Sequence, residues 1–156
     1  MSRIMSTMLV HDIMSTAPVA VSPETPVSDL LALFDRHDFN AFPVVNDRGK
    51  VLGVVSKLDV LGAFLPERKP SHSADGAIAQ VRADALMTRD VLAVGPEDSL
   101  VVAGELMVGA KLHSLLVIEQ RGSETSLVGI VSRGDILRGL RYRLDDALPV
   151  YDESNW

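Results

Sequence analysis

The chain of 156 residues is long enough for one domain, or for two small halves that share a core. Hydrophobic residues make up 47%, aromatic residues only 4%, and there is no cysteine, which excludes disulfides and thiolate metal sites. The net charge of −6 argues against nucleic acid as a partner, because phosphate binding needs a basic patch. We expect a cytoplasmic protein that binds no membrane, since no apolar run reaches the roughly 20 residues needed to span a bilayer.

The first half predicts a short strand, a helix, a hairpin and a closing helix. The strand covers residues 19–21. Thr25 is the expected N-cap of the helix, with Pro26 as its first residue and apolar side chains at helical spacing behind it. The runs FPVVN and KVLGVVS, separated by DRG, predict the hairpin. The closing helix begins at Ser56.

The second half predicts the same order of elements. A strand at 92–94 precedes a helix capped by Asp98, and SLLVIE and SLVGIVS form a hairpin with a longer polar turn. The last helix begins at Ser132. We expect an α/β (α+β) chain of two β-α-β-β-α units, 8–65 and 83–147, with a linker at 66–82 and a tail at 148–156. Each unit is too small for a comfortable core, so the two should pack sheet to sheet.

The two halves align in register over almost their whole length. Met14 meets Met87, and Val21 meets Val94 at the same offset. The second half then gains three residues within EQRGSETS, after which Gly53 meets Gly129. An ordered series with one insertion in a polar turn indicates duplication rather than chance.

One phrase stands out in each half, GVVSKLDVL at 53–61 and GIVSRGDIL at 129–137. Ser-x-x-Asp is a helix-capping signal, because the acidic side chain three residues on can accept from the backbone N–H of the cap. The same residues also suit a ligand: a Ser hydroxyl and a neighbouring cation can bind phosphate, and a carboxylate can accept from two ribose hydroxyls. The preceding glycine permits close backbone approach or marks a bulge. The phrase alone does not separate these interpretations.

The doubled pattern closely resembles a tandem pair of cystathionine-β-synthase-like (CBS) domains, the Bateman module. The resemblance covers about residues 8–64 and 83–144. It implies two units around a pseudo-two-fold axis, with two clefts that take adenosine compounds such as AMP, ADP, ATP or S-adenosylmethionine. It also implies a homodimer and a regulated partner protein. We expect the protein to require no cofactor.

The resemblance assigns roles to matching positions in both halves. Asp59 and Asp135 would bind ribose, while Ser56 and Ser132, with the cations Lys57 and Arg133, would face phosphate. The base would lie against the segment that enters each unit and against the start of its second strand. The residues expected there are Thr16, Ala17, Pro18, Ala41, Phe42 and Pro43 in the first half, and Arg89, Asp90, Val91, Ser114, Leu115 and Leu116 in the second.

Three differences of the second half from the first half and from the family pattern predict that the two clefts are unequal. Leu116 replaces Pro43, Gly134 lies in the first helical turn, and Asp90 adds a negative charge that would repel phosphate. His113, like the other histidines, is expected at the surface, with a position facing the second cleft as the alternative. No nucleophile, base and oxyanion site assemble, so we expect no enzyme. Two functions stay open: a sensor of adenine nucleotides, or a structural dimerisation module whose clefts bind nothing.

Overall fold

The computed structural model describes residues 3–65 and 75–147. The helices are α1 (Arg3–Thr7), α2 (Val10–Ile13), α3 (Val27–Arg36), α4 (Lys57–Ala63), α5 (Asp75–Ile78), α6 (Ala83–Leu86), α7 (Leu100–Ala110) and α8 (Arg133–Ala147). The strands are β1 (Ser15–Thr16), β2 (Ala41–Val45), β3 (Val51–Ser56), β4 (Ala93–Val94), β5 (Ser114–Arg121) and β6 (Glu124–Ser132). The predicted mixed fold with a hairpin and a closing helix in each half is confirmed.

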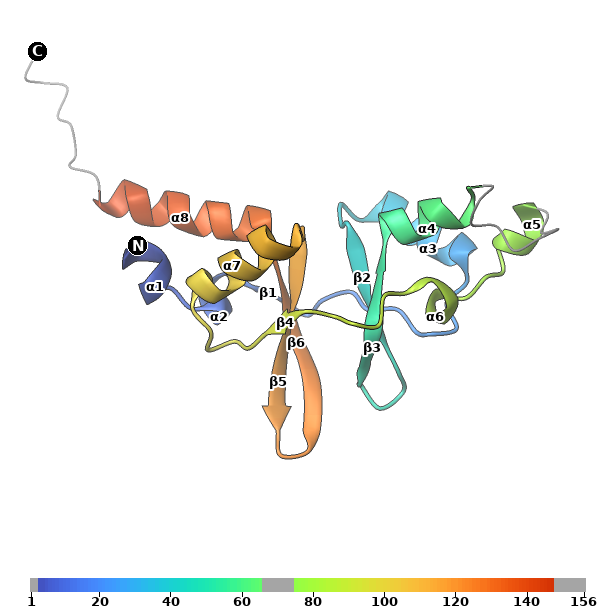
Figure 1. Cartoon of the computed structure of the whole chain (residues 1–156), viewed down its shortest axis with the longest axis horizontal. Coiled ribbons are helices and arrows are strands. Elements are labelled where there is room, and N and C mark those ends of the chain that lie inside the picture. Colours follow the sequence, from blue (N-terminus) through green and yellow to red (C-terminus); the bar gives the residue numbers. More distant parts are fainter. Residues whose placement is uncertain (1–2, 66–74, 148–156) are drawn as a thin grey trace, which may run out of the picture.

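The two hairpins stand next to each other at the middle of the molecule, and the helices lie to either side (Figure 1). One sheet has the strand order β1-β6-β5-β4, and the other consists of β2 and β3. Two isolated bridges extend the smaller sheet in the same order, Thr88 beside Val54 and Val21 beside Val44. The sheets are therefore equivalent, as the duplication predicts.

Each unit packs the segment at its own N-terminal start against the other unit. Helix α2 and strand β1 lie on the second unit, where Val10 is buried with Leu100 and Val131. Helix α6 lies on the first unit, where Ala83 is buried with Val27. This exchange joins the two cores through the backbone, although each core is a separate hydrophobic cluster.

The glycine of each repeated phrase permits this exchange. A side chain at Gly53 would place its Cβ 2.5 Å from the backbone oxygen of Thr88, and one at Gly129 would come 2.8 Å from the oxygen of Ser15. Both glycines also lie next to a shift in strand register. Close backbone approach and a bulge therefore occur together, and the approaching backbone is that of the other half.

The helix caps predicted from sequence are wrong by one residue. The N-caps are Pro26 and Ser99, whereas Thr25 and Asp98 accept hydrogen bonds from the backbone within the preceding turn. The free N–H groups at the helix starts are satisfied by the exchanged segments: Val27 donates to the Val81 oxygen, and Leu100 donates to that of Met8. A backbone partner distant in sequence replaces the side-chain cap.

Two further expectations change. The insertion in the second half lengthens β5 and β6, which pair as far as Arg121 and Glu124, and the turn stays tight because Gly122 has a φ of 64°. The predicted linker is partly structured: α5 lies within it, and Ile78 is buried. Residues 66–74 and the predicted tail lie outside the described residues. Within the described ranges, no helix is long and apolar enough to cross a membrane.

Candidate functional site

Two cavities lie between the sheets, each at the start of a closing helix. The first, about 380 Å³, lies beside Asp59 and is called the Asp59 cleft. The second, about 420 Å³, lies beside Asp135 and is called the Asp135 cleft. Both volumes are in the range of small-molecule sites. The repeat therefore forms two clefts of similar size.

Each cleft combines the two halves of the chain crosswise. The Asp59 cleft is closed by residues 88 and 90–92, near the start of the second unit, and the Asp135 cleft by 15–19, near the start of the first. Asp90 consequently lies in the Asp59 cleft, so its expected effect on the other cleft is wrong. Asp90 lies there because the neighbouring Thr88 pairs with β3 of the first unit, just as β1 pairs with β6 of the second.

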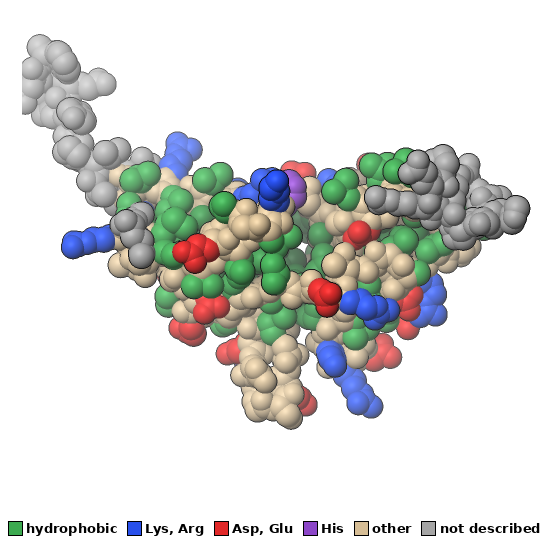
Figure 2. Space-filling model, in the orientation of Figure 1, with side chains coloured by type: hydrophobic (Ala, Val, Ile, Leu, Met, Phe, Trp, Pro, Cys, Tyr) green, Lys and Arg blue, Asp and Glu red, His purple; other side chains and the backbone are tan. Residues whose placement is uncertain are grey.

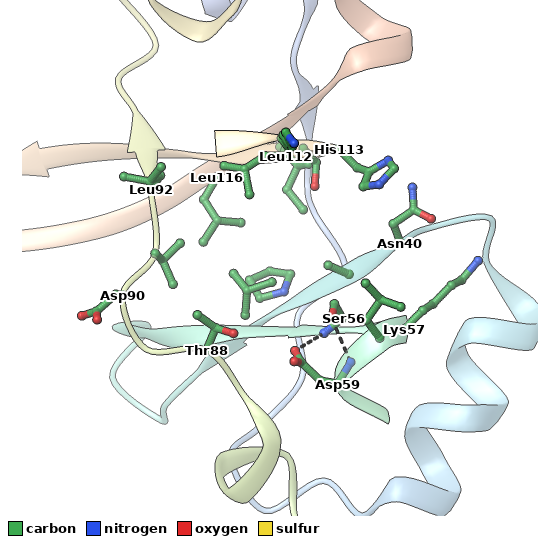
Figure 3. A pocket seen from close by; sticks show the side chains of 18 residues that line it. Asn40, Ser56, Lys57, Asp59, Thr88, Asp90, Leu92, Leu112, His113 and Leu116 are labelled. Atoms are coloured by element: carbon green, nitrogen blue, oxygen red, sulfur yellow. Dashed lines mark hydrogen bonds between the residues drawn. The ribbon is translucent and has the colours of Figure 1, made fainter. Parts of the chain in front are cut away.

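The Ser-x-x-Asp phrase forms the same capping box in both halves. In the first, the N–H of Ser56 donates to Oδ2 of Asp59 at 2.8 Å, and the N–H of Asp59 donates to Oγ of Ser56 at 3.1 Å (Figure 3). Ser132 and Asp135 repeat these bonds at the same distances. Helix capping is thus established for both phrases.

Capping leaves part of each group available for a ligand. The Ser56 hydroxyl accepts in the box and keeps its own proton to donate. Asp59 uses Oδ2, and among the described residues no partner contacts its Oδ1. Figure 3 shows the Asp59 carboxylate on the floor of the cleft, with His113 and Leu116 on the opposite wall. The capping and ligand interpretations are therefore compatible.

The structure brings most of the predicted site residues together. Pro43, Ser56, Lys57, Asp59, Val91 and Ser114 line the Asp59 cleft. Thr16, Ala17, Pro18, Ser114, Ser132 and Asp135 line the Asp135 cleft. These residues come from both halves, which explains why neither half contains a complete site by itself.

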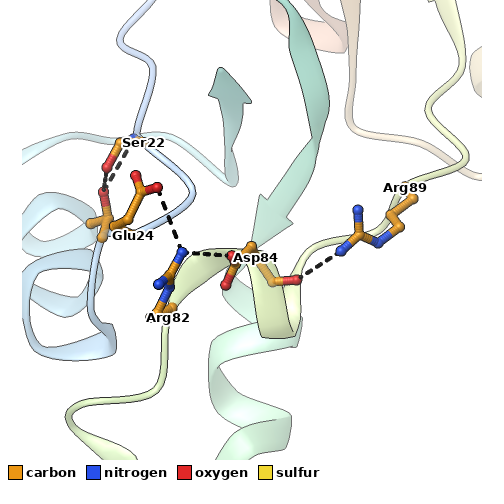
Figure 4. Close-up of polar contacts among 6 residues, drawn as sticks. Ser22, Glu24, Arg82, Asp84 and Arg89 are labelled. Atoms are coloured by element: carbon orange, nitrogen blue, oxygen red, sulfur yellow. Dashed lines mark hydrogen bonds and ion pairs between the residues drawn. The ribbon is translucent and has the colours of Figure 1, made fainter. Parts of the chain in front are cut away.

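Four predicted site residues lie elsewhere. Phe42 and Leu115 are 0% and 1% exposed, because they point to the helix side of their strands and join the two cores. Arg133 contacts the His113 ring and lines a groove between α1, α7 and α8. Arg89 donates to the Asp84 backbone oxygen at 3.4 Å, while the Asp84 carboxylate accepts from Arg82 on the other side (Figure 4).

Sequence reasoning missed Asn40 and Arg138 as lining residues, and for His113 it favoured the surface over the cleft. Asn40 and His113 occupy equivalent positions in the repeat, and both line both clefts. Arg138 lines the Asp135 cleft, where its guanidinium donates to Oδ1 of Asp135 at 2.5 Å. The alignment of the halves could have found the first pair. Arg138 has no such signal, because Gly62 stands at the equivalent position.

The model of the CBS domain matches residues 10–66 and 81–142, which together make up most of the chain. The chain belongs to the CBS domain family. Its two copies form a tandem CBS pair, as the sequence resemblance implied. Among the described residues no cluster of three or more potential metal ligands occurs.

Known proteins resemble this CBS pair along nearly its whole length. Uncharacterized protein MJ1426 of Methanocaldococcus jannaschii is 28% identical, over 85% of this chain and 91% of its own. The crystal structure of CBSX2 in complex with AMP matches with a TM-score of 0.72 and 27% identity, over 88% of this chain and 98% of that one. The CBS pair of protein MJ0100, solved with 5′-methylthioadenosine and S-adenosyl-L-methionine, has a TM-score of 0.72 and 21% identity over 87% and 98%. At that identity it shows the fold alone.

Proposed function

We propose that this CBS pair is a regulatory module, without catalysis of its own, that senses adenine nucleotides of the AMP, ADP and ATP class. S-adenosylmethionine is a related candidate. The observation that carries the proposal is the position of Asp59, whose cap uses one carboxylate oxygen and leaves the other at a cleft of about 380 Å³. The similarity to CBSX2, a CBS protein crystallised with AMP, supports this ligand class.

Each lining group has a chemical task in this proposal. Oδ1 of Asp59 accepts from the ribose hydroxyls, while the Ser56 hydroxyl and the Lys57 ammonium bind phosphate. Pro43 and Leu116 offer an apolar surface to the adenine ring. In the other cleft, the residues proposed to contact a ligand are Thr16, Ala17, Pro18, Ser132 and Asp135.

The shared wall of the clefts suggests how ligand binding is relayed. Asn40, Ala41, His113, Ser114 and Ile130 line both cavities. A ligand that holds this wall in one arrangement favours the corresponding packing of the two sheets. Such a shift requires that the ligand binds the two arrangements with different affinity.

A second copy of the chain is the proposed assembly partner. Large apolar side chains are exposed along α4 and α8, including Leu58 (73%), Leu61 (58%) and Leu137 (66%). Figure 2 shows hydrophobic side chains on the upper surface of that view, where α8 and α4 run in Figure 1. Covering an exposed apolar face of this kind favours association. This surface also supports the alternative function, a dimerisation module that binds no nucleotide.

Thermal unfolding with ligands separates the two functions. AMP, ATP and S-adenosylmethionine are each added to the full chain, with ribose 5-phosphate as the control for charge. Binding to the native state raises the melting temperature, because the ligand stabilises that state alone. If no adenosine compound raises the melting temperature at millimolar concentration, the sensor proposal fails and the dimerisation module remains.

Asp59 provides the matched variant. Asp59→Ala removes the proposed ribose acceptor and should weaken AMP binding by about 1–3 kcal/mol, measured by calorimetry. Asp47→Ala, an exposed carboxylate in the turn between β2 and β3, is the control and should leave AMP affinity unchanged. Equal affinity of the Asp59 variant and the native chain would exclude the proposed role.

A further inference from the structure

The two clefts differ in charge at equivalent positions of the repeat. Lys111 lines the Asp59 cleft, and Asp38 lines the Asp135 cleft. Asp38 lies between α3 and β2, and Lys111 lies at the equivalent position between α7 and β5. The repeat therefore places a cation in one cleft where the other cleft has an anion. This is a difference of two charge units at one place in the site.

The cations available to a ligand also differ. Lys57 and Lys111 both line the Asp59 cleft, and among the described residues neither forms an ion pair. Figure 3 shows Lys57 at the end of the cleft near Asn40 and His113, whereas Asp90 lies at the opposite end with its carboxylate directed away from the interior. One end of this cleft therefore presents positive charge to a ligand.

In the Asp135 cleft the corresponding cation is already engaged. Arg138 bonds Oδ1 of Asp135, whose Oδ2 already accepts from Ser132, so both carboxylate oxygens have partners. Within the part of the chain that the structure describes, the charged side chains that line this cleft, apart from the shared His113, are Asp38, Asp135 and Arg138. After Arg138 and Asp135 neutralise each other, the Asp38 charge remains. Because like charges repel, a phosphate is disfavoured here.

We infer that the two clefts bind different classes of adenosine ligand: the Asp59 cleft takes a phosphorylated one, and the Asp135 cleft takes one whose 5′ group is uncharged or cationic. The inference rests on the proposed function, since it assumes that both clefts bind an adenosine moiety. Lys111 and Asp38 are then the residues that determine specificity. A thioether or sulfonium nucleoside fits the second class, and the Asp38 carboxylate, which has no ion-pair partner among the described residues, attracts a cation.

The test compares AMP with adenosine, which differ only in the phosphate, by titration calorimetry on the full chain. We expect one AMP site, which Asp59→Ala weakens at least about tenfold, as loss of a charge-assisted hydrogen bond would. Asp135→Ala should leave AMP affinity within about twofold. Adenosine should occupy both clefts, and each Asp variant should remove one of its sites.

Charge exchange tests the specificity residues directly. Lys111→Asp should weaken AMP about tenfold or more and change adenosine affinity less than about threefold, while Asp38→Lys should create a second AMP site. Lys50→Asp, at the end of the turn between β2 and β3, makes the same change in net charge outside both clefts and should not affect AMP. Melting temperatures verify that every variant is folded.

The outcomes separate this inference from the proposed function. Two equivalent AMP sites in the native chain, or an Asp38→Lys variant with no additional AMP site, overturn the division of ligands while a nucleotide sensor stands. Binding of adenosine alone, in either cleft, also overturns it. If neither AMP nor adenosine binds the native chain, the proposed function fails and the inference fails with it.

Discussion

At the scale of single residues, Ser56 and Asp59 show how one motif serves two purposes. The capping box occupies the acceptor side of the hydroxyl and one oxygen of the carboxylate. A ligand would use the hydroxyl proton and the other oxygen. Both interpretations need the same two residues at the same spacing, and they use different lone pairs and protons of the same side chains. For this reason the sequence alone could not separate them.

Removing the cap hydroxyl should reduce stability in either half. Ser56→Ala and Ser132→Ala should each lower the free energy of unfolding by about 1 kcal/mol, since each loses the acceptor for an N–H at the helix start. Urea unfolding measures this difference. Ser28→Ala, exposed on α3, should stay within about 0.5 kcal/mol. An equal effect at all three serines would show that the box does not stabilise the fold.

At the scale of elements, two glycines determine where the exchanged segments lie. Gly53 and Gly129 allow the backbones of Thr88 and Ser15 to pair with β3 and β6. No side chain fits between the strands at these distances. The exchange in turn positions residues 88, 90–92 and 15–19 against the clefts, so a packing requirement in the sheet also determines the site.

Gly53→Ala should therefore destabilise the chain by about 1–3 kcal/mol, because the added Cβ overlaps the oxygen of Thr88. Gly109→Ala is the matched control: a Cβ added there would meet nothing within 4 Å, and alanine favours the helix, so stability should rise by up to about 1 kcal/mol. Chemical unfolding of both variants checks the sign. Similar values for the two would refute the close approach at Gly53.

At the scale of the whole molecule, the exchange couples the two units. Val10 lies at the start of the first unit in sequence and is buried in the core of the second. Ala83 has the reciprocal position in the first core. Neither unit retains its outer elements if the other unfolds, so we expect one cooperative transition rather than two.

Calorimetry tests this coupling. The van't Hoff and calorimetric enthalpies of unfolding should agree for the native chain and for Val10→Ala, which should lose about 2 kcal/mol through its cavity and lost apolar burial. Two resolved transitions, with only the second unit affected by Val10→Ala, would show that the units unfold independently.

The exposed apolar face of α4 and α8 predicts that two whole chains associate through it. Leu61→Lys combined with Leu137→Lys should convert the proposed dimer to a monomer, because two exposed apolar contacts are replaced by charges. Light scattering after size exclusion measures the mass. Gln120→Lys, at the far end of the β5–β6 hairpin, should leave the dimer intact. A monomeric native chain would contradict the assembly.

Particular residues show which features of the fold the sequence alone could predict. The duplicated order predicted the hairpins, the closing helices and the capping boxes at Ser56 and Ser132, because these depend on neighbours within a few residues. The predicted caps at Thr25 and Asp98 are wrong, since the true partners are the oxygens of Val81 and Met8, distant in sequence. Leu31 belongs to the apolar spacing that predicts the first helix, yet it is 47% exposed.

The sequence by itself determined the duplication, the family and the local geometry of Ser56 with Asp59 and Ser132 with Asp135. Only the tertiary structure decided that each cleft takes its closing segment from the other half, that Phe42 and Leu115 belong to the cores, and that Arg138 neutralises Asp135. The physical reason is range: capping and periodicity act over a few residues. The strand exchange and the charge of each cleft depend on contacts between segments far apart in the chain.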